Sequence, residues 1–490
     1  MHWLFIGSAT LSLFLSTSAL FRGIVDHGHW NELRGLPRSA SQNASQIKSS
    51  SPPMVIDTFQ NLTHNDLGFW HGSGENLTVQ HGPGFIRLLP TDPDQNFHTQ
   101  FDTNLCYSLI PWYNEYLHVE FEGTDQFSIS LNQHNDECSP HRSPFPSVTD
   151  SVQAERYVMH PASEASGDDD DDWDDDDDWD DDDDMDLDKR RRNQYKHGQC
   201  KSSRRKHPKG NSRIPTGRRQ LYIPLSHFAV DFNRVVSFSF HGFYTQETLT
   251  LHRVEIVPDI PPPIPENGHY RLPGKLPSGR LVLRCSRPNS FAFGIDDGHP
   301  QFSQRVMRIL DEENVRVTFF VVGAGLRDQT SNFTEFYKEM LRKGHQVALH
   351  SNTHPKMESL PTLRDIDNEI IQAIQVFKDK LGIESSYFRP PYGTVGARLR
   401  QQLARNIPNP YIVNWSVDVE DWLWANTTTP EKQLEAFYRG VGMGGNLAVM
   451  HYLNPTTINY LPQFIRHVKG AGYQIMRIDQ CLEDSSAPPL

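Results

Sequence analysis

The sequence has few cysteines, no excess of basic residues and a single long apolar run, and each shortage disfavours a class of protein. Its five cysteines among 490 residues show no spacing typical of a zinc site. Its 47 lysines and arginines are outnumbered by 61 aspartates and glutamates, which argues against a nucleic-acid partner because such binders need a basic face. Beyond the first apolar run, nothing approaches the roughly 18 residues of a membrane-spanning helix, so we expect no membrane span.

The hydrophobic content, by contrast, is sufficient for sizeable cores. Hydrophobic residues make up 37% of the chain, and its length predicts about two to four domains. An apolar run from Trp3 to Leu15, followed by small residues ending at Ala19, predicts a signal peptide over residues 1–19. The alternative is a buried N-terminal helix. We therefore expect a secreted protein, extracellular or in a cell wall, and a monomer.

Sequons and cysteines fit secretion. Glycosylation is expected at five sequons, whereas a sixth, Asn414, is not among the expected sites. The expected sites are Asn43, Asn61, Asn76, Asn332 and Asn426. In an oxidising compartment the simplest cysteine pairing is Cys106 with Cys138 and Cys285 with Cys481. Cys200 is then left over, either free or cross-linking.

The N-terminal half has the pattern of an antiparallel β protein. Residues 20–53 are rich in Ser, Asn and Pro and predict a flexible lead-in. Short alternating runs over residues 54–257 predict a β-sandwich, with a charged insert at residues 166–219. Four aromatic residues could serve as carbohydrate-stacking platforms, although such residues more often fill a core. They are Trp70, Trp112, Tyr113 and Tyr116.

The insert carries the strongest charges of the chain. All but four of the 21 positions from Asp168 to Asp188 are aspartates, and a basic run to Arg219 follows at once. Like-charge blocks of this size cannot pack, which predicts a solvated loop. Loose cation binding by the acidic run, or docking to polyanions by the basic run, is the alternative.

The C-terminal half alternates strands with helices. A proline-rich stretch predicts an interdomain linker over residues 258–279. Residues 280–484 then predict a parallel α/β domain, a distorted barrel with seven strand–helix units.

Polar motifs stand where the predicted strands of this domain end, the edge at which such barrels carry their sites. Each motif taken alone is also compatible with a turn, a polar loop or core packing. Together, five such strand ends in order favour a functional site. The motifs are Asp296-Asp297-Gly298, His350 to His354, Arg389-Pro390-Pro391-Tyr392-Gly393, Asp418 to Trp422, and Met450-His451.

These five motifs resemble, in order, those of the polysaccharide deacetylases of carbohydrate esterase family four, the chitin deacetylase type. The resemblance covers about residues 280–483 and suggests a fungal source. It implies that Asp297, His350 and His354 hold a divalent metal, usually zinc, with cobalt or manganese as alternatives. It also implies that the partner is a polysaccharide substrate whose N-acetyl groups are hydrolysed to amines and acetate.

The resemblance implies roles for further residues of the same motifs. Asp296 would be the general base, held by Arg389, and the Tyr392 backbone N–H would stabilise the oxyanion. His451 would protonate the leaving amine, with Asp418 orienting it. Three residues would line the substrate pocket: Pro391, Trp422 and Met450.

The chain departs from the family pattern at the last motif. Where Leu-His-Asp is usual, this chain has Met450-His451-Tyr452. This departure keeps open a catalytically silent protein that binds wall glycan. A further alternative is an esterase acting on the O-acetyl groups of xylan with the same machinery.

Overall fold

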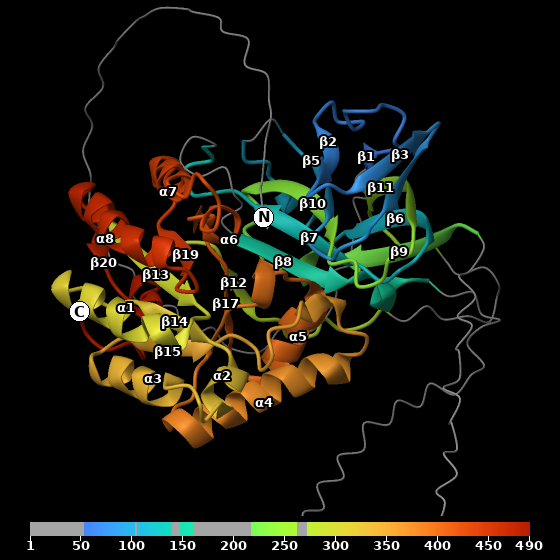
Figure 1. Cartoon of the computed structure of the whole chain (residues 1–490). Helices are drawn as coiled ribbons and strands as arrows, with labels where there is room; N and C mark the ends of the chain where they lie inside the picture. The colour runs from blue at the N-terminus through green and yellow to red at the C-terminus, as the bar shows by residue number, and fades with distance from the viewer. Residues whose placement is uncertain (1–52, 103–104, 140–147, 160–216, 262–271) are drawn as a thin grey trace, which may run out of the picture.

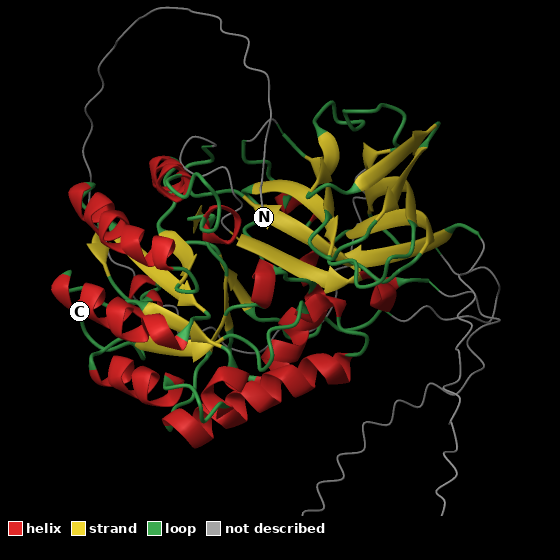
Figure 2. Cartoon of the chain, in the orientation of Figure 1, coloured by secondary structure: helices red, strands yellow, loops and turns green. Residues whose placement is uncertain are grey.

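The computed structural model describes residues 53–102, 105–139, 148–159, 217–261 and 272–490. The predicted signal peptide and lead-in, Asn43, Cys200, most of the charged insert and part of the linker lie outside these residues. Figures 1 and 2 show two neighbouring bodies, one of antiparallel strands and one of strands covered by helices.

The N-terminal body consists of two antiparallel sheets. One has the order β3-β4-β11-β6-β9, with β1 paired to β11, and the other has the order β2-β5-β10-β7-β8. The strands are β1 Met54–Asp57, β2 His71–Gly74, β3 Thr78–Gly82, β4 Phe85–Leu89, β5 Asn96–Gln100, β6 Tyr116–Gly123, β7 Ser128–Gln133, β8 Val148–Gln153, β9 Arg219–Pro224, β10 Val235–His241 and β11 Leu249–Val257.

Alternating apolar side chains of both sheets enter one hydrophobic cluster. Ile86 and Leu251 of the first sheet and Phe97 and Phe238 of the second are all fully buried in it. The antiparallel sheets that the sequence predicts are therefore present, while the β-sandwich remains an interpretation of how they pack.

The two sides of the charged insert lie next to each other. Val158 pairs with Leu221 in an isolated antiparallel bridge, and the Met159 N–H donates to the Gln220 carbonyl at 2.8 Å. β9 begins at Arg219, the last residue assigned to the insert from the sequence. The segment that carries the acidic and basic runs thus leaves and re-enters the domain at one place.

The sheet of the C-terminal body is parallel throughout. Its strands follow the order β12-β17-β16-β15-β14-β13-β19-β18, with β20 also paired to β13. They are β12 Arg280–Val282, β13 Ser290–Asp296, β14 Thr318–Val321, β15 Gln346–Leu349, β16 Tyr387–Phe388, β17 Tyr411–Val413, β18 Val417–Asp418, β19 Leu447–His451 and β20 Gln474–Ile475.

This sheet is curved but not closed into a ring. β17 and β18 stand near opposite ends of the strand order, yet residues 414–416 alone connect them along the chain. The sheet must therefore bend until its two ends approach each other. Among the described strands no pairing joins β12 to β18, so the expected distorted barrel is present as an open half-barrel rather than a closed ring.

Helices follow the strands of the sheet, as the alternation of the sequence predicts. They are α1 Ser303–Glu312, α2 Gly323–Arg327, α3 Phe333–Arg342, α4 Leu363–Leu381, α5 Ala397–Asn406, α6 Asp421–Trp424, α7 Lys432–Gly442, α8 Pro455–Gly470 and α9 Ile478–Cys481. All of them but α6 and α9 contribute to the hydrophobic core on the outer face of the sheet. The longest, α4, begins with a capping box formed by Thr362 and Asp365 and ends at Gly382, whose φ is 69°. Among the described residues, no helix combines the length and apolarity needed to cross a bilayer.

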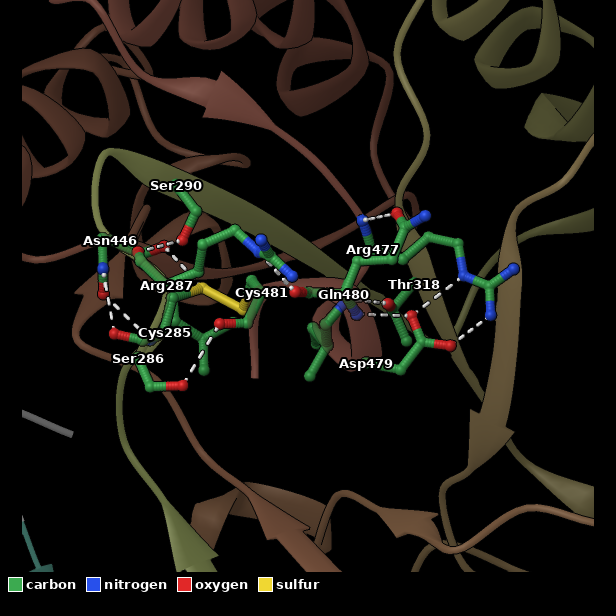
Figure 3. Close-up of a disulfide and its surroundings, with 12 residues drawn as sticks. Cys285, Ser286, Arg287, Ser290, Thr318, Asn446, Arg477, Asp479, Gln480 and Cys481 are labelled. Carbon is green, nitrogen blue, oxygen red and sulfur yellow. Dashed lines mark hydrogen bonds and ion pairs between the residues drawn. A yellow bond between two sulfur atoms is a disulfide. The ribbon is translucent and has the colours of Figure 1, made fainter. Parts of the chain in front are cut away.

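Both predicted disulfides are present. Cys106 is bonded to Cys138 in the N-terminal body, and Cys285 to Cys481 in the C-terminal one. Figure 3 shows the second bond, with Ser286 and Arg287 beside it; their backbone N–H groups both donate to the Cys481 carbonyl. The bond fixes α9 to the segment that enters β13, across a separation of 196 residues.

Candidate functional site

Strand alternation divides the parallel sheet into an apolar outer face and an inner face that becomes polar at one end. Phe293, Ile295 and Met450 belong to the outer core under the helices. Ala292, Phe320, Ala348 and Leu447 belong to a smaller inner cluster, closed by α9 and the Cys285–Cys481 bond. Because successive side chains point to opposite faces, the next inward positions are occupied by polar residues at the strand ends. These positions are Asp296, His350, Arg389 and His451.

Asp297, His350 and His354 come together as the sequence predicts. One ligand atom from each lies within 4.8 Å of the other two. His350 Nε2 is 3.7 Å from Asp297 Oδ1, and His354 Nε2 is 3.6 Å from Asp297 Oδ2. Two imidazoles and one carboxylate, with further positions open, form the donor set typical of catalytic zinc.

Hydrogen bonding leaves the His350 ring ready to act as a ligand. Its Nδ1 lies 2.7 Å from the carbonyl oxygen of Arg389, which can only accept, so Nδ1 carries the proton. The lone pair is then on Nε2, which faces Asp297. Burial lowers the pKa of His354, against the attraction of the Asp297 carboxylate, and so favours its neutral, metal-binding form.

Asp296 is buried beside a buried arginine. Arg389 Nη1 donates to Asp296 Oδ1 at 2.6 Å, and both side chains are almost fully buried. The rest of the guanidinium is fixed by carbonyl oxygens, from Val413 at 3.0 Å to Nε and from Asn414 at 3.3 Å to Nη2. Arg389 thus gives Asp296 a charge-assisted hydrogen bond and fixes the position of its carboxylate in the buried site.

The Arg389-to-Gly393 motif forms a turn of unusual backbone geometry. Pro391 is buried, whereas Tyr392 has a φ of 61° and is 53% exposed. The Tyr392 ring stands edge-on to His354 at 4.9 Å between centroids. Tyr392 is the second residue of this one-turn helix, where a backbone N–H has no acceptor within the helix.

The partner of His451 differs from the prediction. His451 Nδ1 lies 2.8 Å from Asp421 Oδ1, and its backbone N–H donates to Asp421 Oδ2 at 2.7 Å. Burial disfavours the protonated ring, but Asp421, with Asp296 and Asp297 nearby, outweighs this effect and raises the pKa of His451 to about 10. The assignment of Asp418 as the orienting carboxylate was wrong, because Asp421 makes this contact.

Asp418 has a different local environment. Its Oδ1 accepts the Glu420 N–H at 2.7 Å, in the turn that leads into α6. Burial raises the pKa of its carboxyl to about 6. The left-handed backbone of Glu420, with a φ of 56°, turns the chain so that Asp421 rather than Asp418 faces the histidine.

Met450 does not reach the predicted pocket. It is fully buried in the outer core and pairs in register with Ile295, another outer residue. Val449 pairs with the inward Gly294 and shares the face of His451, so it replaces Met450 as the residue beside the histidine. The alternation of the strand, counted back from His451, would have identified Val449 from sequence. Trp422, in contrast, is 56% exposed next to Asp421, where a substrate can contact it.

Residues with left-handed backbone are concentrated in the loops that carry these motifs. Five residues of the motifs, none of them glycine, have positive φ. They are Asp297, Ser351, His354, Tyr392 and Glu420. Each such conformation costs about 1–3 kcal/mol and persists where the surroundings enforce it, a pattern that is concentrated at functional sites.

Comparison with known proteins agrees with this geometry. Residues 284–407 match the family model described as polysaccharide deacetylase. The chain contains a polysaccharide deacetylase domain. This domain is 32% identical over 200 residues to the peptidoglycan-N-acetylglucosamine deacetylase PgdA of Listeria monocytogenes, covering 41% of this chain and 40% of the relative. It is 26% identical over 213 residues to a chitin deacetylase of Pestalotiopsis, covering 43% and 70% respectively.

The deacetylase domain also aligns with a solved structure, the chitin deacetylase of Colletotrichum lindemuthianum. The identity is 24% and the TM-score 0.39, covering 43% of this chain and 95% of the other. The chain spans about two fifths of the length of its Listeria relatives, and the match lies in the C-terminal part.

Proposed function

We propose that this chain is a secreted, divalent-metal-dependent hydrolase that removes N-acetyl groups from a cell-wall polysaccharide such as chitin and releases acetate. One observation supports the proposal above all. The buried Asp296 is adjacent along the chain to Asp297 of the candidate metal group, and adjacent across the sheet to His451. The proposed base, metal-ligand set and acid would therefore surround one point.

Asp297, His350 and His354 would hold the cation, with zinc the first choice and cobalt or manganese as alternatives. When bound, such a cation makes a water molecule more acidic and polarises an acyl oxygen. Asp296 would accept a proton from the attacking water, and the hydrogen bond from Arg389 would hold its carboxylate in place for this task.

The remaining groups would complete hydrolysis of the amide. As the water oxygen bonds to the acetyl carbon, the Tyr392 N–H would donate to the carbonyl oxygen, which gains negative charge. His451, held protonated by Asp421, would deliver a proton to the amide nitrogen. Cleavage of the C–N bond then gives acetate and a free amine, which balances one water against one acetamide.

Exposed apolar side chains near the strand ends suit a sugar chain. Tyr392, Trp422 and Leu453 are all at least half exposed and follow the carboxyl ends of β16, β18 and β19. Aromatic faces stack on the apolar faces of sugar rings. Fungal relatives named chitin deacetylase favour chitin in a fungal wall, whereas the Listeria relative acts on peptidoglycan by its name.

Secretion and glycosylation belong to the same proposal. Two disulfides suit an oxidising compartment. The four expected sequons within the described residues, Asn61, Asn76, Asn332 and Asn426, are all exposed. Asn414, which is not an expected site, donates its amide to the Gly393 carbonyl at 2.9 Å and is held within the domain.

For the N-terminal domain we propose a β-sandwich. The structure places its candidate stacking residues differently from one another: Trp112 packs against the core, whereas the Tyr113 side chain is 42% exposed. Trp70 stacks on His98 with ring centroids 6.4 Å apart. Glycan binding by this domain stays a prediction, which pull-down on chitin, chitosan and glucan tests.

The proposed activity is tested by measuring acetate release from chitin, galactosamine-containing glycan, peptidoglycan and acetyl-xylan, with and without chelator. We expect release from an N-acetylated glycan and its loss with chelator. Asp296→Asn should keep the metal and lose acetate release. Undiminished release from this variant contradicts the proposal.

The same panel separates the alternatives. A metal-loaded protein that binds chitin oligomers without releasing acetate is a glycan-binding protein. Release from acetyl-xylan alone makes the chain an O-acetyl esterase.

A further inference from the structure

Helix α5 shows that the N-terminal domain and the deacetylase domain form a tight contact. Every residue from 397 to 403 is buried, although this helix carries two arginines and two glutamines in that stretch. Arg400 donates to the Thr149 carbonyl at 2.9 Å and lies 3.1 Å from Asp150, which is itself buried. Helices buried on all sides are normally apolar, and Arg400 is buried on the side of α5 that the N-terminal domain contacts. Figure 1 shows β7 and β8 beside this helix.

A second contact between the domains lies closer to the candidate metal group. Lys356 Nζ reaches both carboxylate oxygens of Asp92, at 2.8 and 2.7 Å, and Asp94 Oδ2 at 2.7 Å. The Thr394 hydroxyl donates to the other oxygen of Asp94. Two acids of one N-terminal loop thus bind two different loops of the deacetylase domain.

These two loops carry the residues of the site. Lys356 follows His354 by two residues, and Thr394 follows Tyr392 by two. Lys356 Nζ lies 5.6 Å from the centre of the Tyr392 ring, which in turn contacts the His354 ring. His354 and Tyr392 both have left-handed backbone, which needs enforcement by neighbouring contacts.

The N-terminal loop is itself firmly held. The Gln95 side-chain oxygen accepts the Thr91 N–H at 2.7 Å, and Asp92 Oδ1 accepts the Asp94 N–H at 2.9 Å. The Pro93 carbonyl accepts a hydrogen bond at 3.2 Å from the N–H of Gly242, the residue that follows β10. A loop with these internal bonds can impose a position on the segments it contacts.

We propose that Asp92 and Asp94 of the N-terminal domain are positioning residues of the metal site. Through Lys356 and Thr394 they hold the His354 loop and the Tyr392 turn in register with each other. The inference rests on the proposed function for the identity of the ligand, a divalent cation at Asp297, His350 and His354. The N-terminal domain is then part of the reaction centre, whether or not it also binds glycan.

The test measures the zinc and cobalt affinity of the full chain by competition with a chelator. Lys356→Met and the double variant Asp92→Asn/Asp94→Asn should raise the metal Kd about tenfold, the lower end of what loss of a group supporting a ligand costs. Lys356→Arg keeps a positively charged side chain between Asp92 and Asp94, so this variant should retain most of the metal affinity.

The matched control is Lys275→Met. Lys275 pairs with Asp150 at the same domain interface, and its side chain is 25% exposed against 24% for Lys356. Its loss should leave the metal Kd unchanged. Equal Kd changes for both lysines would overturn the proposal in favour of general domain docking, and unchanged Kd in the Lys356 and Asp92/Asp94 variants would overturn it outright.

The outcome is distinct from that of the proposed function. If the wild-type chain releases no acetate from any substrate but the Kd pattern holds, the proposed activity fails and the positioning role stands. If acetate is released and the Kd pattern is absent, the proposed activity stands and the positioning role fails.

Discussion

His451 and Asp421 contact each other twice, through the imidazole Nδ1 at 2.8 Å and through the backbone N–H at 2.7 Å. One carboxylate thus fixes both the ring and the chain of the residue that would protonate the leaving amine. The contact joins the first turn of α6 to the end of β19, through two residues that are 30 positions apart in the sequence.

Replacing Asp421 should therefore impair catalysis more than replacing Asp418. We expect Asp421→Asn to lower kcat about 100-fold, within the range that a positioned acid contributes. Asp418→Asn, which keeps a side-chain oxygen to accept the Glu420 N–H, should have a much smaller effect. Steady-state acetate release with both variants checks this, and a larger loss for Asp418→Asn would return the orienting role to Asp418.

The same contact should make stability depend on pH. The unfolded pKa of histidine is about 6.5, and that of His451 in the fold is about 10. The fold binds the proton more tightly, so its stabilising effect is complete below pH 6.5 and is lost as the pH rises towards 10. Urea unfolding of the metal-free protein should show a free energy of unfolding that declines across this window. The decline should be shallower in Asp421→Asn, and equal slopes would contradict the pairing.

A side chain at Gly294 should break the Asp296–Arg389 pair. A Cβ there would lie 2.3 Å from Arg389 Nη1, so the guanidinium would have to move. We expect Gly294→Ala to lower the free energy of unfolding by about 3–5 kcal/mol, the cost of breaking a buried ion pair, and to reduce kcat. Gly470→Ala is the control, because no atom lies within 4 Å of its Cβ position. Its effect should stay within about 1 kcal/mol, and similar losses for both variants would contradict the steric argument.

Val449 rather than Met450 should control the space for the acetyl group. Val449→Ile adds one methylene on the face of His451, and we expect kcat/KM to fall about tenfold with little change in Tm. Met450→Leu, a volume-conserving change in the outer core, should cost less than about 1.5 kcal/mol and leave kcat/KM intact. Kinetics on one N-acetylated oligosaccharide decide the matter, and the opposite ranking would restore Met450 to the pocket.

Loss of the Cys285–Cys481 bond should destabilise the deacetylase domain strongly. The bond closes a loop of 196 residues, for which the chain-entropy argument gives about 5 kcal/mol. The Cys106–Cys138 bond spans 32 residues, and its removal should cost about 4 kcal/mol. Unfolding of the two double Cys→Ser variants in denaturant measures both values, and a negligible loss for the first would contradict the entropic account.

Much of the metal group could be predicted from the sequence because its residues follow parallel strands, whose carboxyl ends meet at one edge. His350 and His354 also share a single loop. The choice between Asp418 and Asp421 could not be predicted in this way, because both follow β18 and only the backbone turn at Glu420 selects one. The contacts of Lys356 with Asp92 and Asp94 span 264 and 262 residues, so no local sequence pattern could predict them.

The burial of residues 397–403 of α5 bears on attempts to reuse the catalytic half of this chain. Cutting the chain within residues 258–279 would uncover Arg398 and Arg400, which are both 3% exposed in the intact protein. It would also remove the acceptors that Thr149 and Asp150 give to Arg400. An isolated deacetylase domain would therefore need a redesigned surface on this helix. A fusion that replaces the N-terminal domain with another one would have to supply carboxylates in the positions of Asp92 and Asp94.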